Sequence, residues 1–149
     1  MVISIDKTVV CDVPVKDVFA FLADFTSTEQ WDPGTVRTQL VSGDGGVGSV
    51  YENTSRFMGK DSNLTYVVEE YELDQKIVLR GENKSVSAVD TLTFTPNTQG
   101  GTSVRYQAVF RLKGAARFMQ PLVMPAFTRL GTNGARHMEV TLNALRSVN

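Results

Sequence analysis

The sequence is poor in residue types that define whole classes of protein. Its 149 residues include one cysteine and one histidine. Cys11 alone excludes an internal disulfide framework and any multi-cysteine metal site. No HxxxH, HExxH or GxSxG motif accompanies His137, so metal chelation and serine–histidine hydrolysis have no support. We therefore expect neither a metal nor a cofactor.

Long apolar runs and clusters of one charge sign are also missing. No run approaches the roughly 18 apolar residues of a membrane span, and the first ten residues lack the order of a signal peptide. The net charge is −1, with lysines and arginines scattered along the chain, which argues against a nucleic-acid partner. The predicted location is the cytoplasm. The oligomeric state stays open, with a homodimer as one option.

The composition is typical of a single globular domain spanning 1–149, with 42% hydrophobic and 21% charged residues. Residues 2–10 alternate as a strand does, which turns Ile3, Ile5 and Val9 to one face. Pro14 suits the first turn of a helix. Apolar residues follow it at helical spacing: Val15, Val18, Phe19 and Leu22. A capping-box pattern from Ser27 to Gln30 predicts a second, short helix that stops at Asp32-Pro33-Gly34.

The middle of the chain predicts strands joined by short turns rich in Gly, Asp, Asn and Ser. The predicted strands are 35–42, 48–58, 63–73, 76–82, 86–95 and 102–112. Short consecutive connections favour an antiparallel meander. Residues 43–48 match GxGxxG, but they lead into a strand pattern rather than a helix, so we interpret them as a hairpin turn and not as a dinucleotide site.

Beyond Gly114 the pattern becomes helical. Its apolar stripe comprises Phe118, Leu122, Phe127, Leu130, Met138, Leu142 and Leu145. One strand, two helices, six strands and a long helix predict an α+β helix-grip arrangement. In it, a curved seven-stranded antiparallel sheet wraps around the C-terminal helix, whose stripe needs a sheet face to cover it.

The segment 119–127, MQPLVMPAF, interrupts this last helix with two prolines. In one interpretation residues 115–120 form a loose turn, and Pro121 or Pro125 lies in the first turn of the main helix, where proline is tolerated. In the other, both lie inside one kinked helix. Each leaves backbone hydrogen bonds missing beside apolar side chains, namely Met119, Met124 and Phe127.

Asp90 is the most informative polar residue. It shares a strand face with apolar residues, namely Val86, Ala88, Leu92 and Phe94. A buried carboxylate needs a partner, which Arg56 or Arg80 could supply. The alternative is a bulge that turns Asp90 outward, since a one-residue slip inverts the face. No second carboxylate is placed beside it, so catalytic residues stay unassigned. His137 either faces a ligand or is a partly buried surface residue.

Aromatic and methionine residues are numerous. Most must be core, but small residues such as Ala108 and Gly134 leave space beneath one long helix. A pocket lined by aromatics and methionines is the usual environment of an apolar ligand.

Four stretches resemble the SRPBCC superfamily (START and birch-pollen-allergen-like), and more narrowly its polyketide cyclase/dehydrase and lipid-transport group. They are VVCDVPVKDVFAFLADF, EQWDPG, DTLTFTPNTQGGTSVRY and PLVMPAFTRLGTNGARHMEVTLNAL, in family order. The resemblance implies the helix-grip fold. It also implies a deep, mostly apolar cavity between the sheet and the last helix for a lipid, polyketide-like or other hydrophobic molecule. The resemblance places the rim of this cavity beside residues 119–127, whose missing hydrogen bonds then predict a soft entrance.

Three functions are compatible with this resemblance, because the fold hosts many activities. The first is non-catalytic binding of a small hydrophobic ligand, as carrier or sensor. Its expected apolar walls are Trp31, Tyr66, Tyr106, Phe110, Phe118, Phe127 and Met138, and its expected polar groups are Asp90, Arg56 and His137. The second is a cyclase/dehydratase-type enzyme in which an arginine polarises a carbonyl while Asp90 or His137 moves a proton. The third is an interaction module of a larger assembly.

Overall fold

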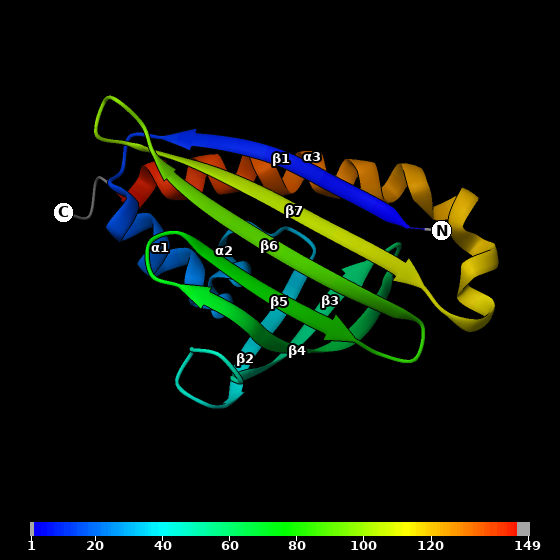
Figure 1. Ribbon diagram of the computed structural model, residues 1–149. Helices are drawn as coiled ribbons and strands as arrows, with labels where there is room; N and C mark the ends of the chain where they lie inside the picture. The colour runs from blue at the N-terminus through cyan, green and yellow to red at the C-terminus, as the bar shows by residue number, and fades with distance from the viewer. Residues whose placement is uncertain (1, 146–149) are drawn as a thin grey trace.

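The computed structural model describes residues 2–145 and is built on one curved sheet (Figure 1). Its strands are β1 (Ile3–Cys11), β2 (Thr35–Ser42), β3 (Val50–Phe57), β4 (Lys60–Glu72), β5 (Lys76–Glu82), β6 (Val86–Pro96) and β7 (Thr102–Leu112). The seven strands run in the order β1-β7-β6-β5-β4-β3-β2, and every neighbouring pair is antiparallel. The predicted meander is therefore confirmed, with β1 returning to pair with the last strand.

Short helices follow β1 and a long helix ends the chain, as predicted. The first group comprises α1 (Val15–Ala23), the 3-10 helix η1 (Phe25–Ser27) and α2 (Thr28–Trp31). A second 3-10 helix, η2 (Gly114–Met119), leads into α3 (Gln120–Ala144). In Figure 1, α3 runs alongside β1 for most of the length of the sheet. This is the helix-grip arrangement. No helix within residues 2–145 is both long and apolar enough to cross a membrane.

Two local predictions about turns need correction. Ser27 does not form a capping box, because the chain passes directly from η1 into α2 and Ser27 already has helical backbone angles. Its Oγ has no hydrogen-bond partner, and Asp24 caps η1 by accepting from the Thr26 N–H at 3.0 Å. The β3–β4 turn consists of Met58 and Gly59 only, so β4 begins three residues before the predicted 63.

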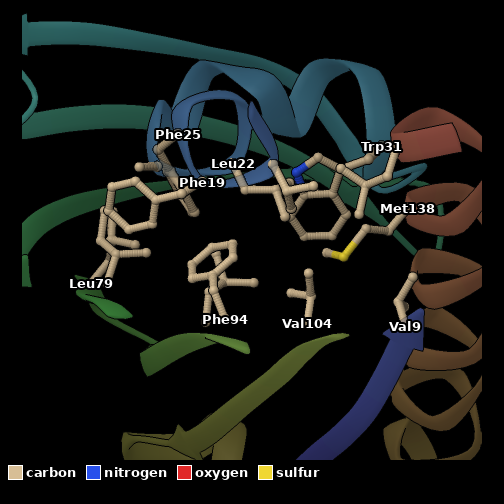
Figure 2. Packing of buried hydrophobic residues seen from close by; sticks show 14 of the residues in the cluster. Val9, Phe19, Leu22, Phe25, Trp31, Leu79, Phe94, Val104 and Met138 are labelled. Atoms are coloured by element: carbon tan, nitrogen blue, oxygen red, sulfur yellow. The ribbon is translucent and has the colours of Figure 1, made fainter. Parts of the chain in front are cut away.

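At one end of the sheet (Figure 1), α1 packs onto the core cluster through its buried side chains, Val18, Phe19, Leu22 and Ala23. Phe19 makes edge-to-face contacts with Tyr71 and Phe94, at centroid distances of 5.3 and 5.0 Å. Figure 2 shows Phe19 and Phe94 facing each other, with Leu79 and Val104 on the sheet side. The β3–β4 turn, the β5–β6 turn and η2 lie at the other end (Figure 1). The two ends of the molecule therefore differ, and α1 seals the first.

The predicted apolar stripe of the C-terminal segment is only partly correct. Phe127, Met138 and Leu142 are buried, but Phe118 and Leu122 are 72% and 66% exposed. Phe118 lies in the 3-10 helix of residues 114–119, whose shorter turn changes the angular position of each side chain relative to α3. Leu122 lies within α3, five residues before Phe127, and this spacing places it on a different side of the helix. The stripe that faces the sheet therefore begins later than the sequence pattern suggested.

Each interpretation of the two prolines is correct in part. The chain enters α3 in two stages, and Pro121 lies in its first turn. Pro125 lies inside the helix, so the Pro121 carbonyl lacks the N–H that an ordinary residue at 125 would donate.

Candidate ligand-binding site

A cavity of about 260 Å³ lies between the inner face of the sheet and α3. Most of its wall is apolar: Ile5, Phe25, Trp31, Phe57, Leu64, Val86, Phe110, Leu112, Ala116, Met119, Val123, Phe127 and Leu130. Its polar lining groups belong to Thr28, Asp32, Thr35, Asn53, Ser55, Ser62, Tyr66, Ser85, Asp90 and Tyr106. Two glycines of α3, Gly131 and Gly134, complete the wall and let the helix approach the sheet without filling the space.

Asp90 points into this cavity from the middle of β6. It pairs across the sheet with Leu79 and Ala108, shares their inward face and is 5% exposed. The Tyr106 hydroxyl donates to its Oδ2 at 3.0 Å, while its Oδ1 has no hydrogen-bond partner. The prediction that Asp90 lies on the apolar, inward face of its strand is therefore correct, and no bulge turns it outward.

The arginine partners predicted for Asp90 are wrong. Arg80 pairs with Val89, the neighbour of Asp90 on β6, so its side chain lies on the outer face of the sheet. There its Nε donates a hydrogen bond to Glu69 at 3.0 Å. Arg56 is exposed and bonds Asp61 at 2.7 Å. A tyrosine hydroxyl, and not a guanidinium, is the partner of Asp90.

Burial without a cation raises the pKa of Asp90 to about 7. The Tyr106 hydrogen bond lowers this pKa and the nearby Asp32 carboxylate raises it, but both effects are smaller than that of burial. The group therefore exists in both its neutral and its ionised form near neutral pH. A carboxyl group in this state can either donate or accept a hydrogen bond.

Asp32 is a second acid in the cavity wall, which the sequence analysis treated only as a helix stop. It accepts from the Gly34 N–H at 2.9 Å and from the Thr35 hydroxyl at 3.0 Å. Burial raises its pKa, and those hydrogen bonds and the charge of His137 oppose the shift. A turn aspartate bonded to the residues after it shows no sequence signal of facing a cavity.

Aromatic rings surround the two acids. Trp31 meets Tyr106 edge-to-face at 5.5 Å between centroids, and Phe25 lies 4.8 Å from Tyr66. Tyr66 lies against the backbone of β5, where a Cβ on Gly81 would be 2.5 Å from its ring. Burial raises the pKa of both tyrosine hydroxyls well above the usual value, so both stay protonated.

A further ring cluster lies where α3 begins. Phe127 packs between Phe57 and Phe110, at centroid distances of 4.6 and 4.8 Å. Ala116, on η2, and Met119, which caps α3, also line the cavity. The cavity therefore extends from Asp32 and Asp90 to the junction between η2 and α3. We call this junction the mouth.

The structure brings together six of the ten residues predicted for the site. Trp31, Tyr66, Asp90, Tyr106, Phe110 and Phe127 line the cavity. Four lie elsewhere: Arg56, Phe118 and His137 are exposed, and Met138 is buried in the core cluster that includes Trp31 (Figure 2). Among the described residues, those that line the cavity include no lysine, arginine or histidine.

The sheet, the gripping helix and the cavity between them define a helix-grip protein of the SRPBCC class. The chain belongs to the family described as polyketide cyclase / dehydrase and lipid transport, whose model matches residues 2–143. No curated protein sequence matches it.

Three solved structures are similar in fold. The Zhui aromatase/cyclase of a Streptomyces species is 14% identical, with a TM-score of 0.81 over 100% of this chain and 97% of that one. A START superfamily protein of Mycobacterium smegmatis is also 14% identical, with a TM-score of 0.79 over 95% and 98%. Ara h 8.0201 is 16% identical, with a TM-score of 0.60 over 93% and 98%. At these identities the likeness concerns the fold alone.

Proposed function

We propose that this protein binds one small, mostly apolar molecule in the cavity, as a carrier or sensor. The observation that carries the proposal is an apolar cavity of about 260 Å³ with Asp90 Oδ1 buried and unpartnered in its wall. This volume is close to the lower end of small-molecule pockets, roughly 300–1,000 Å³. A few polar groups in an apolar wall are the usual means of orienting such a ligand.

The charges of the wall restrict the ligand further. Its carboxylic acids are Asp32 and Asp90, and no basic side chain among the described residues lines the cavity beside them. A ligand carboxylate or phosphate would meet like charge in a poorly solvated space, which is unfavourable. The ligand is therefore uncharged or cationic, with a polar group that exchanges a hydrogen bond with Asp90.

Proton-transfer catalysis is the second candidate, because the pKa of Asp90 is raised to about 7 inside a cavity. The version in which an arginine polarises a carbonyl has no support, since Arg56 and Arg80 are exposed and ion-paired outside the cavity. A pure interaction module is disfavoured for another reason, which is that the interior is not filled.

The test of ligand binding uses native mass spectrometry and a neutral fluorescent probe. Protein purified without detergent is expected to carry added mass in part of the population. N-phenyl-1-naphthylamine should bind at one site per chain, dodecylamine should displace it, and dodecanoate should displace it far less well. Failure of the neutral probe and of dodecylamine to bind would contradict the proposal.

The prolines at the mouth predict how fast a ligand exchanges. Pro121→Ala combined with Pro125→Ala restores an N–H that can bond the carbonyl of residue 121. We expect a stiffer first turn of α3 and several-fold slower release of the probe in stopped-flow measurements. Pro33→Ala, outside α3, is the control. An unchanged release rate in the double variant would refute the soft entrance.

A further inference from the structure

Large apolar side chains project into solvent around the mouth. Phe118 and Leu122, on either side of the junction between η2 and α3, are the most exposed of them, and Met119 between them is 50% exposed. Met58, in the β3–β4 turn, is 64% exposed. Both segments border the cavity, because Met119 and Phe57 line it.

Hydrogen bonds join the neighbouring turns to these segments. The Lys113 N–H, which precedes η2, donates to the Ser85 carbonyl in the β5–β6 turn at 2.8 Å. In the same turn, Asn83 Nδ2 donates to the Ser62 hydroxyl and to the Asn63 carbonyl of β4, both at 3.0 Å. The β3–β4 hairpin, the β5–β6 turn, η2 and residues 120–129 of α3 therefore form one end of the molecule (Figure 1), which we call the docking end.

Met58 has a backbone conformation that is unusual for a bulky residue. Met58 and Gly59 have φ angles of 53° and 81°, the arrangement of a two-residue hairpin turn that favours Asn, Asp or Gly at its first position. A bulky residue in this conformation is uncommon and unfavourable. The turn therefore presents an apolar side chain to solvent at some cost in stability.

The docking end also carries unpaired positive charge. No ion pair within residues 2–145 involves Lys60, Lys84, Arg117 or Arg129. Arg129 follows Leu122 by two helical turns and so lies on the same side of α3. The acidic residues of this end are already paired: Asp61 with Arg56, and Glu82 with Lys113.

The opposite end is acidic. Around α1 and the β4–β5 turn lie five acids, accompanied by Lys16 and by Lys76, which is ion-paired with Glu70: Asp12, Asp17, Asp24, Glu72 and Asp74. Although the net charge is only −1, the charges are distributed unevenly, with one basic end and one acidic end. Such a charge distribution orients a protein in front of an anionic surface.

We propose that the docking end binds membranes that contain anionic lipid. Phe118, Leu122, Met119 and Met58 enter the boundary between headgroups and acyl chains, and the four unpaired basic side chains meet lipid phosphates. Apolar residues flanked by Lys and Arg are the composition of surfaces that bind in this interface. The Arg117 guanidinium lies over the Phe118 ring, 4.9 Å from its centroid, so a basic and an apolar group are presented together. Side chains that project from a turn and a helix start suit a fluid bilayer better than the close-packed core of a protein interface. The cavity mouth would then face the bilayer, and an apolar ligand could pass without crossing water.

Vesicle co-sedimentation tests this surface directly. We expect the protein to bind vesicles of equal parts phosphatidylcholine and phosphatidylglycerol, to bind them less as salt is raised, and to stay in the supernatant with pure phosphatidylcholine. Arg117→Gln with Arg129→Gln should weaken binding about 30-fold, since each basic residue near an anionic surface contributes about a factor of five. Phe118→Ser with Leu122→Ser should weaken it about tenfold or more.

Matched controls are available on the same chain. Leu73 and Val140 are each 68% exposed but lie away from the mouth, so Leu73→Ser with Val140→Ser should bind like the wild type. Lys16→Gln with Arg136→Gln, at two exposed basic residues outside the docking end, is the charge control.

Three results would overturn the membrane proposal: no binding to anionic vesicles, equal binding to both vesicle types, or equal losses in controls and test variants. If the protein did not bind anionic vesicles, the docking end would instead be expected to bind a protein partner. The outcome is separable from that of the proposed function. Gly134→Leu, designed to block the cavity, should keep vesicle binding, and loss of docking should leave probe binding in solution intact.

Discussion

Asp90→Asn is expected to stabilise the protein relative to the wild type as the pH rises. The folded protein holds the pKa of Asp90 at about 7, while the same group in the unfolded chain titrates near 3.8. Between pH 3.8 and about pH 7, Asp90 keeps its proton in the folded state but releases it in the unfolded chain. Stability of the wild type therefore falls with pH across this window.

The size of this effect follows from the two pKa values. Between about pH 4 and about pH 8, the difference in unfolding free energy between the variant and the wild type should shift by roughly 3–4 kcal/mol in favour of the variant. Asparagine keeps the shape of the side chain and an oxygen that can accept from the Tyr106 hydroxyl, but it has no ionised form.

Urea unfolding of both proteins at several pH values measures the shift. Asp6→Asn is the control, because Asp6 is an exposed carboxylate whose pKa the hydrogen bond from Arg105 lowers. Its small effect should have the opposite sign, since a lowered pKa favours the folded state once the group is ionised. The free energy of unfolding of Asp90→Asn relative to the wild type could also be the same at both ends of the pH range. That result would contradict the burial of an unpaired acid.

Gly134→Leu is expected to abolish ligand binding while the fold persists. Gly134 lies on the face of α3 that lines the cavity, and the nearest atom to a Cβ placed there is Trp31 Cζ3 at 4.0 Å. A leucine side chain can therefore extend into the cavity without striking the backbone. The affinity for N-phenyl-1-naphthylamine should fall by about 100-fold or more, which corresponds to about 2.7 kcal/mol.

Gly134→Ala separates the blocked cavity from the change in helix propensity. Alanine in a helix interior is about 1 kcal/mol more favourable than glycine, and its methyl group occupies little of the cavity. Thermal unfolding should show Gly134→Ala above the wild type, with probe affinity nearly unchanged. If Gly134→Leu bound the probe as the wild type does, or if both variants lost binding equally, the ligand would not occupy this space.

The order of elements and the faces of the strands could be predicted from the sequence alone. Alternation along β1 placed Ile3, Ile5 and Val9 on one face, and all three are buried. The Gly-Asp-Gly turn at 43–48 was assigned to a hairpin, and it joins β2 to β3. These predictions depend on residues close together in the chain, where the two-residue period of a strand and the backbone demands of a turn act directly.

The site could be predicted only in part, because its composition depends on contacts between distant segments. Pattern alone put Asp90 on the apolar face, but the partner of Asp90 depended on the β6–β7 register, which brings Tyr106 and not an arginine to it. Asp32 gave no signal, since its hydrogen bonds are local and its place in the cavity wall depends on segments distant in the chain. Phe118 was misplaced because the 3-10 geometry of η2 changed the direction of its side chain.

The sequence by itself determined a seven-stranded sheet, its inward faces, the helix that covers it and the family to which the chain belongs. The tertiary structure alone decided which inward side chains leave a cavity, which two acids share it, and that unpaired basic and apolar side chains gather at its mouth. The physical reason is one of range. Periodicity and turn chemistry act over a few residues, whereas burial, register and the sum of charges at one end are set by segments that meet only after the chain has folded.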